Sequence, residues 1–185
     1  MRVLITGGSG FLGWHTRLRL HAQAEHEVAI VTRESWPDLR ALAAETDAVI
    51  HIAGVNRGDD DEVVDDNVRL AEDVAAAVRE TGRPLRIVYA NSIQSGNGTA
   101  YGTGKERAAE VLRDLESSGS TVVDVRLPNI FGEHGRPRYN SFVATFVHAV
   151  AAGETPQVSD RPVELLHAQG AAQSLIDGLT ADAVR

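Results

Sequence analysis

Tyr101 and Lys105 are the two residues whose types and spacing point most directly to chemistry. A step of four residues places both side chains on one face of a helix, so both can reach one reacting atom. A phenol normally titrates near 10, and its use as a base near neutrality needs a pKa lowered by about 3, roughly 4 kcal/mol, which a nearby cation helps to provide. A phenol that donates a proton to a ketone needs less tuning. The pair therefore predicts proton transfer to a carbonyl oxygen.

Ser92 is the third candidate catalytic residue. It follows the apolar run 86–90, which we expect to be a strand of a parallel sheet, and ligands bind at the carboxyl edge of such a sheet. Its hydroxyl is therefore placed to hold the substrate oxygen. The spacing of Tyr101 and Lys105 alone also fits a surface pair at the start of a helix. Ser92, together with a glycine-rich segment near the N-terminus, favours the catalytic interpretation.

That glycine-rich segment directly follows the first apolar run, residues 3–5. Glycines at its spacing let the backbone turn sharply, approach a pyrophosphate and pack the next helix onto the strand, while the amides at the helix start face the anion. The segment predicts a dinucleotide-binding turn, although similar turns also close ordinary strand–helix junctions. The candidate cofactor-binding residues here are Gly7, Ser9, Gly10, Phe11, Leu12 and Gly13.

Arg33 is the candidate for choosing between the two nicotinamide dinucleotides. It lies about 20 residues past the glycine turn, where an acidic side chain would hold the ribose 2′-hydroxyl and a basic one would accept a 2′-phosphate. A charge-assisted contact of about 1.5–3 kcal/mol corresponds to roughly a ten- to hundredfold preference. We therefore expect NADP(H) rather than NAD(H). Glu34 is adjacent and leaves open that Arg33 is only a solvated charge at the end of a strand.

The elements that must position these residues alternate along the chain. Short apolar runs rich in Val and Ile are separated by segments of helical character, the pattern of an α/β protein with a doubly wound parallel sheet. Leu70, Val74 and Val78 recur at helical spacing on one such segment. The predicted strands are 3–5, 28–31, 48–52, 86–90 and 121–125, and the predicted helices are 11–24, 60–81, 101–118, 140–152 and 168–182.

Composition narrows the class of protein. A chain of 185 residues with 43% hydrophobic residues is sized for one domain, and a formal net charge of -8 argues against nucleic acid or an anionic membrane surface as partner. The absence of cysteine permits a reducing compartment, and no run is long and apolar enough for a membrane span. We expect a cytoplasmic protein without a signal peptide. Histidine spacing predicts no metal site, and the run 59–62 is expected to be a solvated helix start.

Together these residues resemble the short-chain dehydrogenase/reductase superfamily, in its extended branch that handles nucleotide sugars. The resemblance covers nearly the whole chain and implies a Rossmann fold with Ser92, Tyr101 and Lys105 as the catalytic set. It also implies that Pro128 and Ile130 flank the nicotinamide. Its further cofactor-binding residues are Ala53, Gly54 and Asn67, and its substrate-binding residues are Gln94, Asn129 and Asn140.

A narrower resemblance is to bacterial capsular-polysaccharide reductases that make an N-acetylated 6-deoxytalose nucleotide. It implies hydride transfer from NADPH to the 4-keto group of a UDP-linked 2-acetamido-2,6-dideoxyhexulose. Ile93 and Gln94 stand where dehydratases of the branch place an acidic pair, and neither moves a proton, so dehydration is not expected. The segments that carry this resemblance are 53–57, 92–94, 128–132, 139–141 and 160–165.

The chain departs from these relatives in its C-terminal part. They usually continue for well over a hundred further residues, and residues 167–172 depart from the pattern that anchors the last helix. We expect a single domain over 1–185, with a cofactor core at 1–132 and a shortened substrate arm and terminal helix at 133–185. Two alternatives stay open: a nucleotide-sugar epimerase, and a catalytically weak NADP(H)-binding protein. The resemblance also implies a homodimer paired through helices 60–81 and 101–118.

Overall fold

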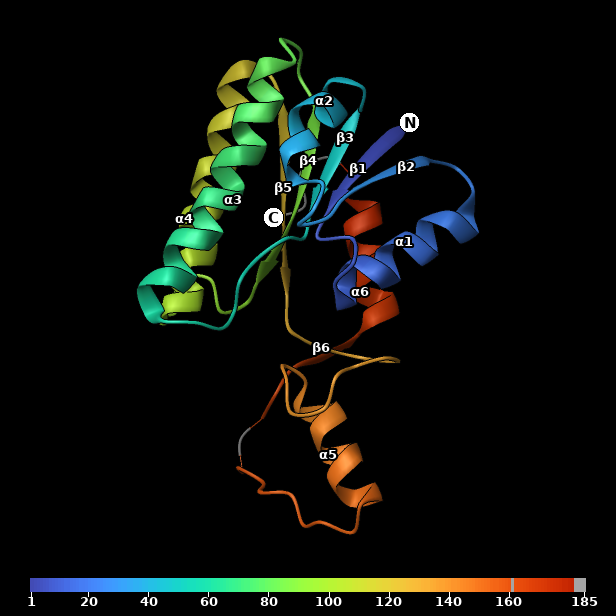
Figure 1. The fold of residues 1–185 in the computed structure, drawn as a ribbon, viewed down its shortest axis with the longest axis vertical. Coiled ribbons are helices and arrows are strands. Elements are labelled where there is room, and N and C mark those ends of the chain that lie inside the picture. Colours follow the sequence, from blue (N-terminus) through green and yellow to red (C-terminus); the bar gives the residue numbers. More distant parts are fainter. Residues whose placement is uncertain (161, 182–185) are drawn as a thin grey trace.

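A five-stranded parallel sheet forms the centre of the molecule in the computed structural model, which describes residues 1–160 and 162–181. The chain goes from β1 to a neighbour on one side and then returns to the other side of β1. The topological switch point, where ligands bind in such sheets, therefore lies between β1 and β3. In sheet order the strands are β2 (Glu27–Val31), β1 (Arg2–Thr6), β3 (Ala48–His51), β4 (Arg86–Ser92) and β5 (Thr121–Leu127) (Figure 1).

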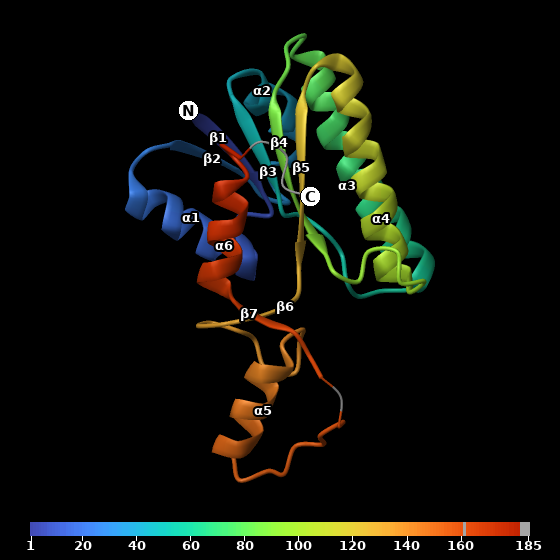
Figure 2. The same ribbon diagram turned by 180° about the vertical axis from the view of Figure 1, so that it is seen from behind.

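Helices cover both faces of this sheet, which confirms the predicted doubly wound α/β fold. Helices α1 (Phe11–Gln23) and α6 (Ala168–Asp177) pack together on one face (Figures 1 and 2). The opposite face carries α2 (Leu39–Ala44), α3 (Asp60–Glu80) and α4 (Ala100–Arg113). None of the helices within the described residues has the length and hydrophobicity of a membrane span.

The strands are continuous apolar runs because both faces of the sheet are buried. Along β1, Leu4 points into the core under α3 and α4, whereas Val3 and Ile5 point into the core under α1 and α6. The acidic run 59–62 forms the N-cap and first turn of α3, which confirms the predicted helix start. Asp59 is the N-cap and forms a capping box with Glu62, which satisfies amides that the helix leaves free.

A small lobe lies beyond the carboxyl ends of the strands. The chain leaves β5, forms the short strand β6 (Asn129–Phe131), passes through α5 (Phe142–Ala151) and returns as β7 (Leu165–His167), which pairs with β6 in parallel. Figures 1 and 2 show α5 standing away from the sheet at this end. The lobe therefore faces the edge at which the switch point opens.

The predicted elements are confirmed with two kinds of correction. The last helix ends at Asp177, short of the predicted 168–182, because Gly178, a poor helix former, is its C-cap; residue 182 lies outside the described residues. The predicted helix 101–118 is α4 followed by a 3-10 turn, Asp114–Ser118. The structure adds α2, β6 and β7, which are too short to produce a hydrophobic period.

Candidate active site

The glycine turn lies at the carboxyl end of β1, beside the end of β3. Gly7 adopts a left-handed conformation with φ of 71°, and a Cβ there would lie 2.6 Å from the backbone nitrogen of Ala53. A Cβ on Gly13 would lie 2.1 Å from the carbonyl oxygen of Gly7, so α1 can approach the turn only without a side chain at this position. The turn is therefore built for close backbone packing.

The start of α1 leaves its amides for an anion. The N-cap is Gly10, which supplies no side-chain cap, so the amides of Phe11, Leu12 and Gly13 point outward from the first turn. Ser9 is exposed in the same turn. Free amides at a helix start, next to a turn that admits no side chain, fit the pyrophosphate of a dinucleotide.

The loop after β3 forms the facing wall. The Thr6 hydroxyl accepts a hydrogen bond from the Ala53 amide at 3.3 Å, which ties the ends of β1 and β3 together. Asn67 of α3 is buried, and its amide group bonds both backbone groups of Val55, at 2.6 and 3.3 Å. The predicted residues Ala53 and Gly54 thus line the switch point. Asn67 shapes the loop that carries them.

Ser92, Tyr101 and Lys105 come together at the carboxyl end of β4. Ser92 is the last residue of that strand, and α4 begins at Ala100 with Thr99 as its N-cap, whose hydroxyl accepts from the Gly102 amide at 3.1 Å. The first turn of α4 therefore carries Tyr101, and Lys105 follows one turn later. The Ser92 hydroxyl accepts from the Gln94 amide at 3.1 Å, which leaves its own proton to donate.

Burial controls the ionisation of the two reactive groups. It raises the pKa of the Tyr101 phenol, and a hydrogen bond with Ser92 opposes that rise. Burial also lowers the pKa of Lys105 to about 7, although the nearby negative charge of Asp124 acts to raise it. The Lys105 Nζ donates to the Ala90 carbonyl at 2.7 Å. The phenol is thus protonated at neutral pH, which is the form that donates a proton.

The remaining predicted residues are spread over the rim. Gln94 is exposed beside Ser92, and Arg33 is exposed just past β2. Pro128 and Ile130 are half-buried between sheet and lobe, with Ile130 packed on the core under α6. Asn129 Nδ2 donates to the Glu164 carbonyl at 3.4 Å.

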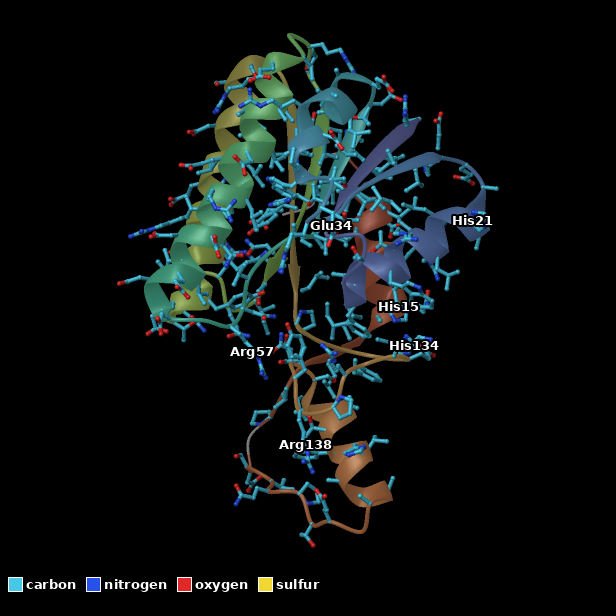
Figure 3. All side chains as sticks on the ribbon, in the orientation of Figure 1. His15, His21, Glu34, Arg57, His134 and Arg138 are labelled. Carbon is cyan, nitrogen blue, oxygen red and sulfur yellow. The ribbon has the colours of Figure 1, made fainter. Side chains whose placement is uncertain are left out.

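Arg57 is a residue of this rim to which sequence reasoning assigned no role. It reaches from the loop after β3 to the lobe, where its Nε donates to Asn140 Oδ1 at 3.1 Å and its guanidinium lies 4.7 Å from the ring centroid of Tyr139 (Figure 3). Arg57 also donates to the Tyr139 carbonyl. The predicted substrate residue Asn140 is therefore joined to the loop that lines the switch point.

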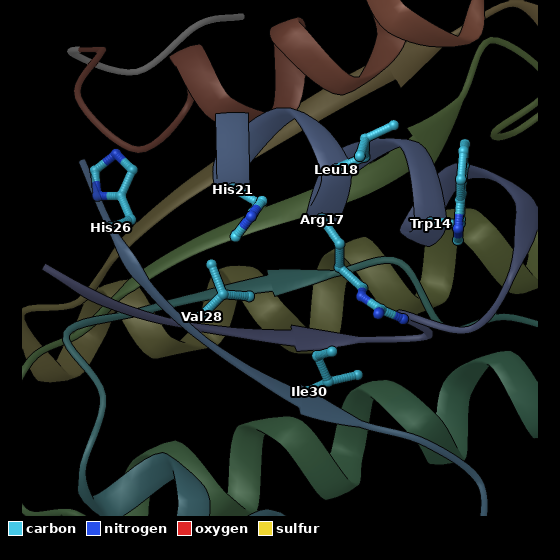
Figure 4. Close-up of a pocket in the computed structure, with 7 residues that line it drawn as sticks. All are labelled: Trp14, Arg17, Leu18, His21, His26, Val28 and Ile30. Atoms are coloured by element: carbon cyan, nitrogen blue, oxygen red, sulfur yellow. The ribbon is translucent and has the colours of Figure 1, made fainter. Parts of the chain in front are cut away.

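Two hollows lie outside this cluster. One, of about 460 Å³, lies between α1 and the edge strand β2, and its lining residues are Trp14, Arg17, Leu18, His21, His26, Val28 and Ile30 (Figure 4). The other, of about 520 Å³, lies between α5 and the segment after β6. Neither is lined by Ser92, Tyr101 or Lys105, so neither hollow is the candidate active site.

A glycine turn at the switch point and a Ser-Tyr-Lys cluster at the end of β4 lie on a Rossmann fold, an architecture that binds dinucleotides. The chain belongs to the NAD dependent epimerase/dehydratase family, whose model matches residues 3–176. It is 38% identical over 168 residues to a UDP-2-acetamido-2,6-beta-L-arabino-hexul-4-ose reductase of Pseudomonas aeruginosa, covering 89% of this chain and 45% of that protein.

Solved structures share the fold. The capsular polysaccharide assembling protein CapF of Staphylococcus aureus is 30% identical, with a TM-score of 0.76 over 98% of this chain and 50% of that one. A UDP-glucose 4-epimerase of Thermus thermophilus in complex with NAD is 21% identical, with a TM-score of 0.84 over 99% of this chain and 76% of that one, and shows the shared fold. The chain thus spans about half the length of its reductase and CapF relatives.

Proposed function

We propose that this protein is an NADPH-dependent reductase of a UDP-linked 4-keto-deoxy sugar, working in the synthesis of a cell-surface polysaccharide. The observation that carries the proposal is the cluster at the end of β4, where a phenol kept protonated by burial stands beside Ser92 and one helical turn from Lys105. The identity to a 4-keto-sugar reductase supports the choice of substrate.

Each residue of the cluster has one role in the reduction. Ser92 donates a hydrogen bond to the keto oxygen, keeps its own proton and holds the carbonyl beside Tyr101. Tyr101 gives its proton to the same oxygen as the carbon is reduced, so the ketone becomes an alcohol. Lys105 places a positive charge beside the phenol and stabilises the phenolate that remains. When bound, NADPH supplies the hydride for the keto carbon and leaves as NADP⁺.

The cofactor is held by the glycine turn and by the loop after β3. The residues assigned to it are those of the turn, Arg33, Ala53 and Gly54, with Asn67 supporting the loop. Arg33 favours NADP(H) over NAD(H) because a guanidinium pairs with a 2′-phosphate. A hydrogen bond from Thr32 lowers the pKa of the neighbouring Glu34, so its carboxylate stays charged. The preference for NADP(H) therefore depends on the attraction of Arg33 for the 2′-phosphate and the opposing repulsion from Glu34.

We assign the substrate to the space between the sheet edge and the lobe. Gln94, Asn129 and Asn140 supply amide groups there, and Pro128 and Ile130 supply the apolar wall against the nicotinamide. Residues 133–185 supply the shortened substrate arm and the terminal helix, and the arm is fastened to the cofactor core through Arg57. We also infer a homodimer paired through α3 and α4, for which sedimentation should give twice the chain mass of 19.8 kDa. The proposed substrates and the absence of cysteine favour the cytoplasm.

The test is consumption of NADPH, followed by its absorbance, with the UDP-linked 2-acetamido-2,6-dideoxy-4-hexulose as substrate. Wild-type protein should oxidise NADPH in proportion to added keto sugar. Tyr101→Phe should lose at least a hundredfold in rate, consistent with the loss of a general acid, while binding NADPH as before. Binding of NADPH without any tyrosine-dependent turnover would overturn the proposal and favour a binding protein.

A further inference from the structure

Lys105 is the only lysine in the chain, and it lies inside the protein with 3% of its surface exposed. The other 17 of the 18 Lys and Arg residues are arginines. The Lys105 Nζ contacts the Ala90 carbonyl at 2.7 Å and lies 4.1 Å from the ring centroid of Tyr89. Both contacts offer partial negative charge, but neither is an anion.

Beneath Lys105, polar side chains cross the sheet in one row. Thr6 of β1 pairs with His51 of β3, His51 with Tyr89 of β4, and Tyr89 with Asp124 of β5. Residues paired in register on parallel strands point to the same face, so these side chains all face α3 and α4. The rings of His51 and Tyr89 are stacked with centroids 5.5 Å apart. The row therefore continues from the switch point to Asp124, the strand neighbour of the Tyr89 ring that Lys105 contacts.

Asp124 ends this row with an unusual carboxylate. Its Oδ1 is buried and has no hydrogen-bond partner, while its Oδ2 lies 3.9 Å from Nε of Arg126, a side chain that is 61% exposed. A buried acceptor without a partner costs about 1–3 kcal/mol, so a carboxyl group at this position weakens the fold unless it has another use. The fold alone does not account for its presence.

We propose that Asp124 is a positioning residue for the active site: its half-buried carboxylate is the counter-charge that keeps Lys105 an ammonium. The other titratable groups that face Lys105 within the described residues are His51 on β3, Tyr89 on β4 and Tyr101 on its own helix. His51 is neutral because burial lowers its pKa to about 3, and burial raises the pKa of both phenols. From α3 the facing residue is Asn67, which does not titrate.

The consequence for catalysis rests on the proposed function, but the charge of Lys105 does not. Burial lowers the pKa of Lys105 to about 7, with the charge of Asp124 acting in the opposite direction. Without that charge, the lysine would lose its proton below neutral pH and would no longer stabilise the Tyr101 phenolate. Asp124 thus extends the working range of the site upward in pH.

The single lysine makes a direct test available. Untagged protein labelled with ¹³C and ¹⁵N lysine gives one lysine side-chain signal, whose ¹³Cε shift against pH reports the ionisation of Lys105. Asp124→Asn should lower the midpoint by about one pH unit, which is a tenfold lower affinity of Lys105 for its proton. Asp124→Glu keeps the negative charge, so its midpoint should be close to the wild-type value. The exposed Asp114→Asn should leave the midpoint unchanged. An unchanged midpoint in Asp124→Asn would overturn the proposal.

Two further arms keep the outcome clear. Arg126→Gln removes the exposed cation beside Asp124 and should therefore raise the Lys105 midpoint. If Asp124→Asn does not fold, this variant becomes the deciding test. An unchanged midpoint in Arg126→Gln would then refute the proposal. In turnover assays, Asp124→Asn should shift the basic limb of the kcat/KM profile downward by the same amount. A shifted NMR midpoint in a protein that never turns over keto sugar would retain the role of Asp124 and refute the proposed function.

Discussion

The Thr6 hydroxyl and the Nδ1 atom of His51 lie 2.7 Å apart inside the sheet. The Thr6 hydroxyl accepts from the Ala53 amide, which leaves its own proton free to be donated to His51 when Nδ1 carries no proton. This hydrogen bond links the floor of the switch point to the polar row that ends at Asp124.

Acid should therefore weaken the fold through His51. Its pKa is about 3 in the folded protein and 6.5 ordinarily, so the unfolded chain binds the extra proton between these values. The contribution of His51 to the free energy of unfolding is therefore complete above pH 6.5. Below pH 6.5 this free energy falls by up to about 1.4 kcal/mol per pH unit. Urea unfolding measures the free energy of unfolding that is lost between pH 7.5 and pH 5.0. This loss should be about 2 kcal/mol smaller in His51→Asn than in the wild-type protein. The exposed His21→Asn is the matched control, and equal losses in all three proteins would contradict this role.

The double variant Lys105→Met, Asp124→Asn should stabilise the protein while abolishing its activity, because removing Lys105 alone would leave the Asp124 carboxylate without its counter-charge. The pKa of Lys105 is lowered from 10.5 to about 7, so the folded state bears the cost of burying the charge in full below pH 7, and the cost disappears as pH rises to 10.5. Methionine fills a similar volume without charge. We expect a gain of roughly 1–4 kcal/mol in unfolding free energy at pH 6, shrinking above pH 7. A variant less stable than wild type at pH 6 would show that the ammonium is fully compensated.

Gly13→Ala should damage the glycine turn. The added Cβ would lie 2.1 Å from the Gly7 carbonyl oxygen, which forces α1 away from β1 at a cost of about 1–3 kcal/mol. Thermal unfolding and NADPH titration should both show the effect. In the control Gly170→Ala, the new Cβ meets only the flexible end of Leu166 at 3.1 Å, and stability should hold or rise. Wild-type NADPH affinity in Gly13→Ala would refute the placement of the dinucleotide.

Arg33→Ala should change the preference between cofactors. Loss of the guanidinium should weaken NADPH binding ten- to hundredfold and leave NADH binding nearly unchanged. Fluorescence titration of both cofactors measures the ratio. Glu34→Gln is the companion variant and should improve NADPH binding, because it removes a negative charge from beside a 2′-phosphate. Equal losses for NADPH and NADH in Arg33→Ala would mean that this residue does not read the ribose.

The parts of the site that depend on local sequence could be predicted. The glycine turn and the step from Tyr101 to Lys105 are short-range patterns, and each predicts its own geometry. The strands were predictable because burial on both faces makes them continuously apolar.

The rest depends on contacts between distant segments. Asp124 lies near Lys105 only because β4 and β5 pair in one register, and nothing near Asp124 in the sequence indicates this. Arg57 meets Tyr139 and Asn140 across more than 80 residues. The pairing of β6 with β7 joins three-residue strands, which are too short to show an alternating pattern.

The most direct test of the proposed reaction is the fate of the hydride. The purified protein is given the UDP-linked 4-keto sugar and NADPH deuterated at nicotinamide C4, and the sugar product is analysed by mass spectrometry and NMR. The reductase assignment predicts one deuterium at sugar C4 for each NADPH oxidised, and none with Tyr101→Phe. An epimerised sugar without deuterium and without net oxidation of NADPH would contradict it.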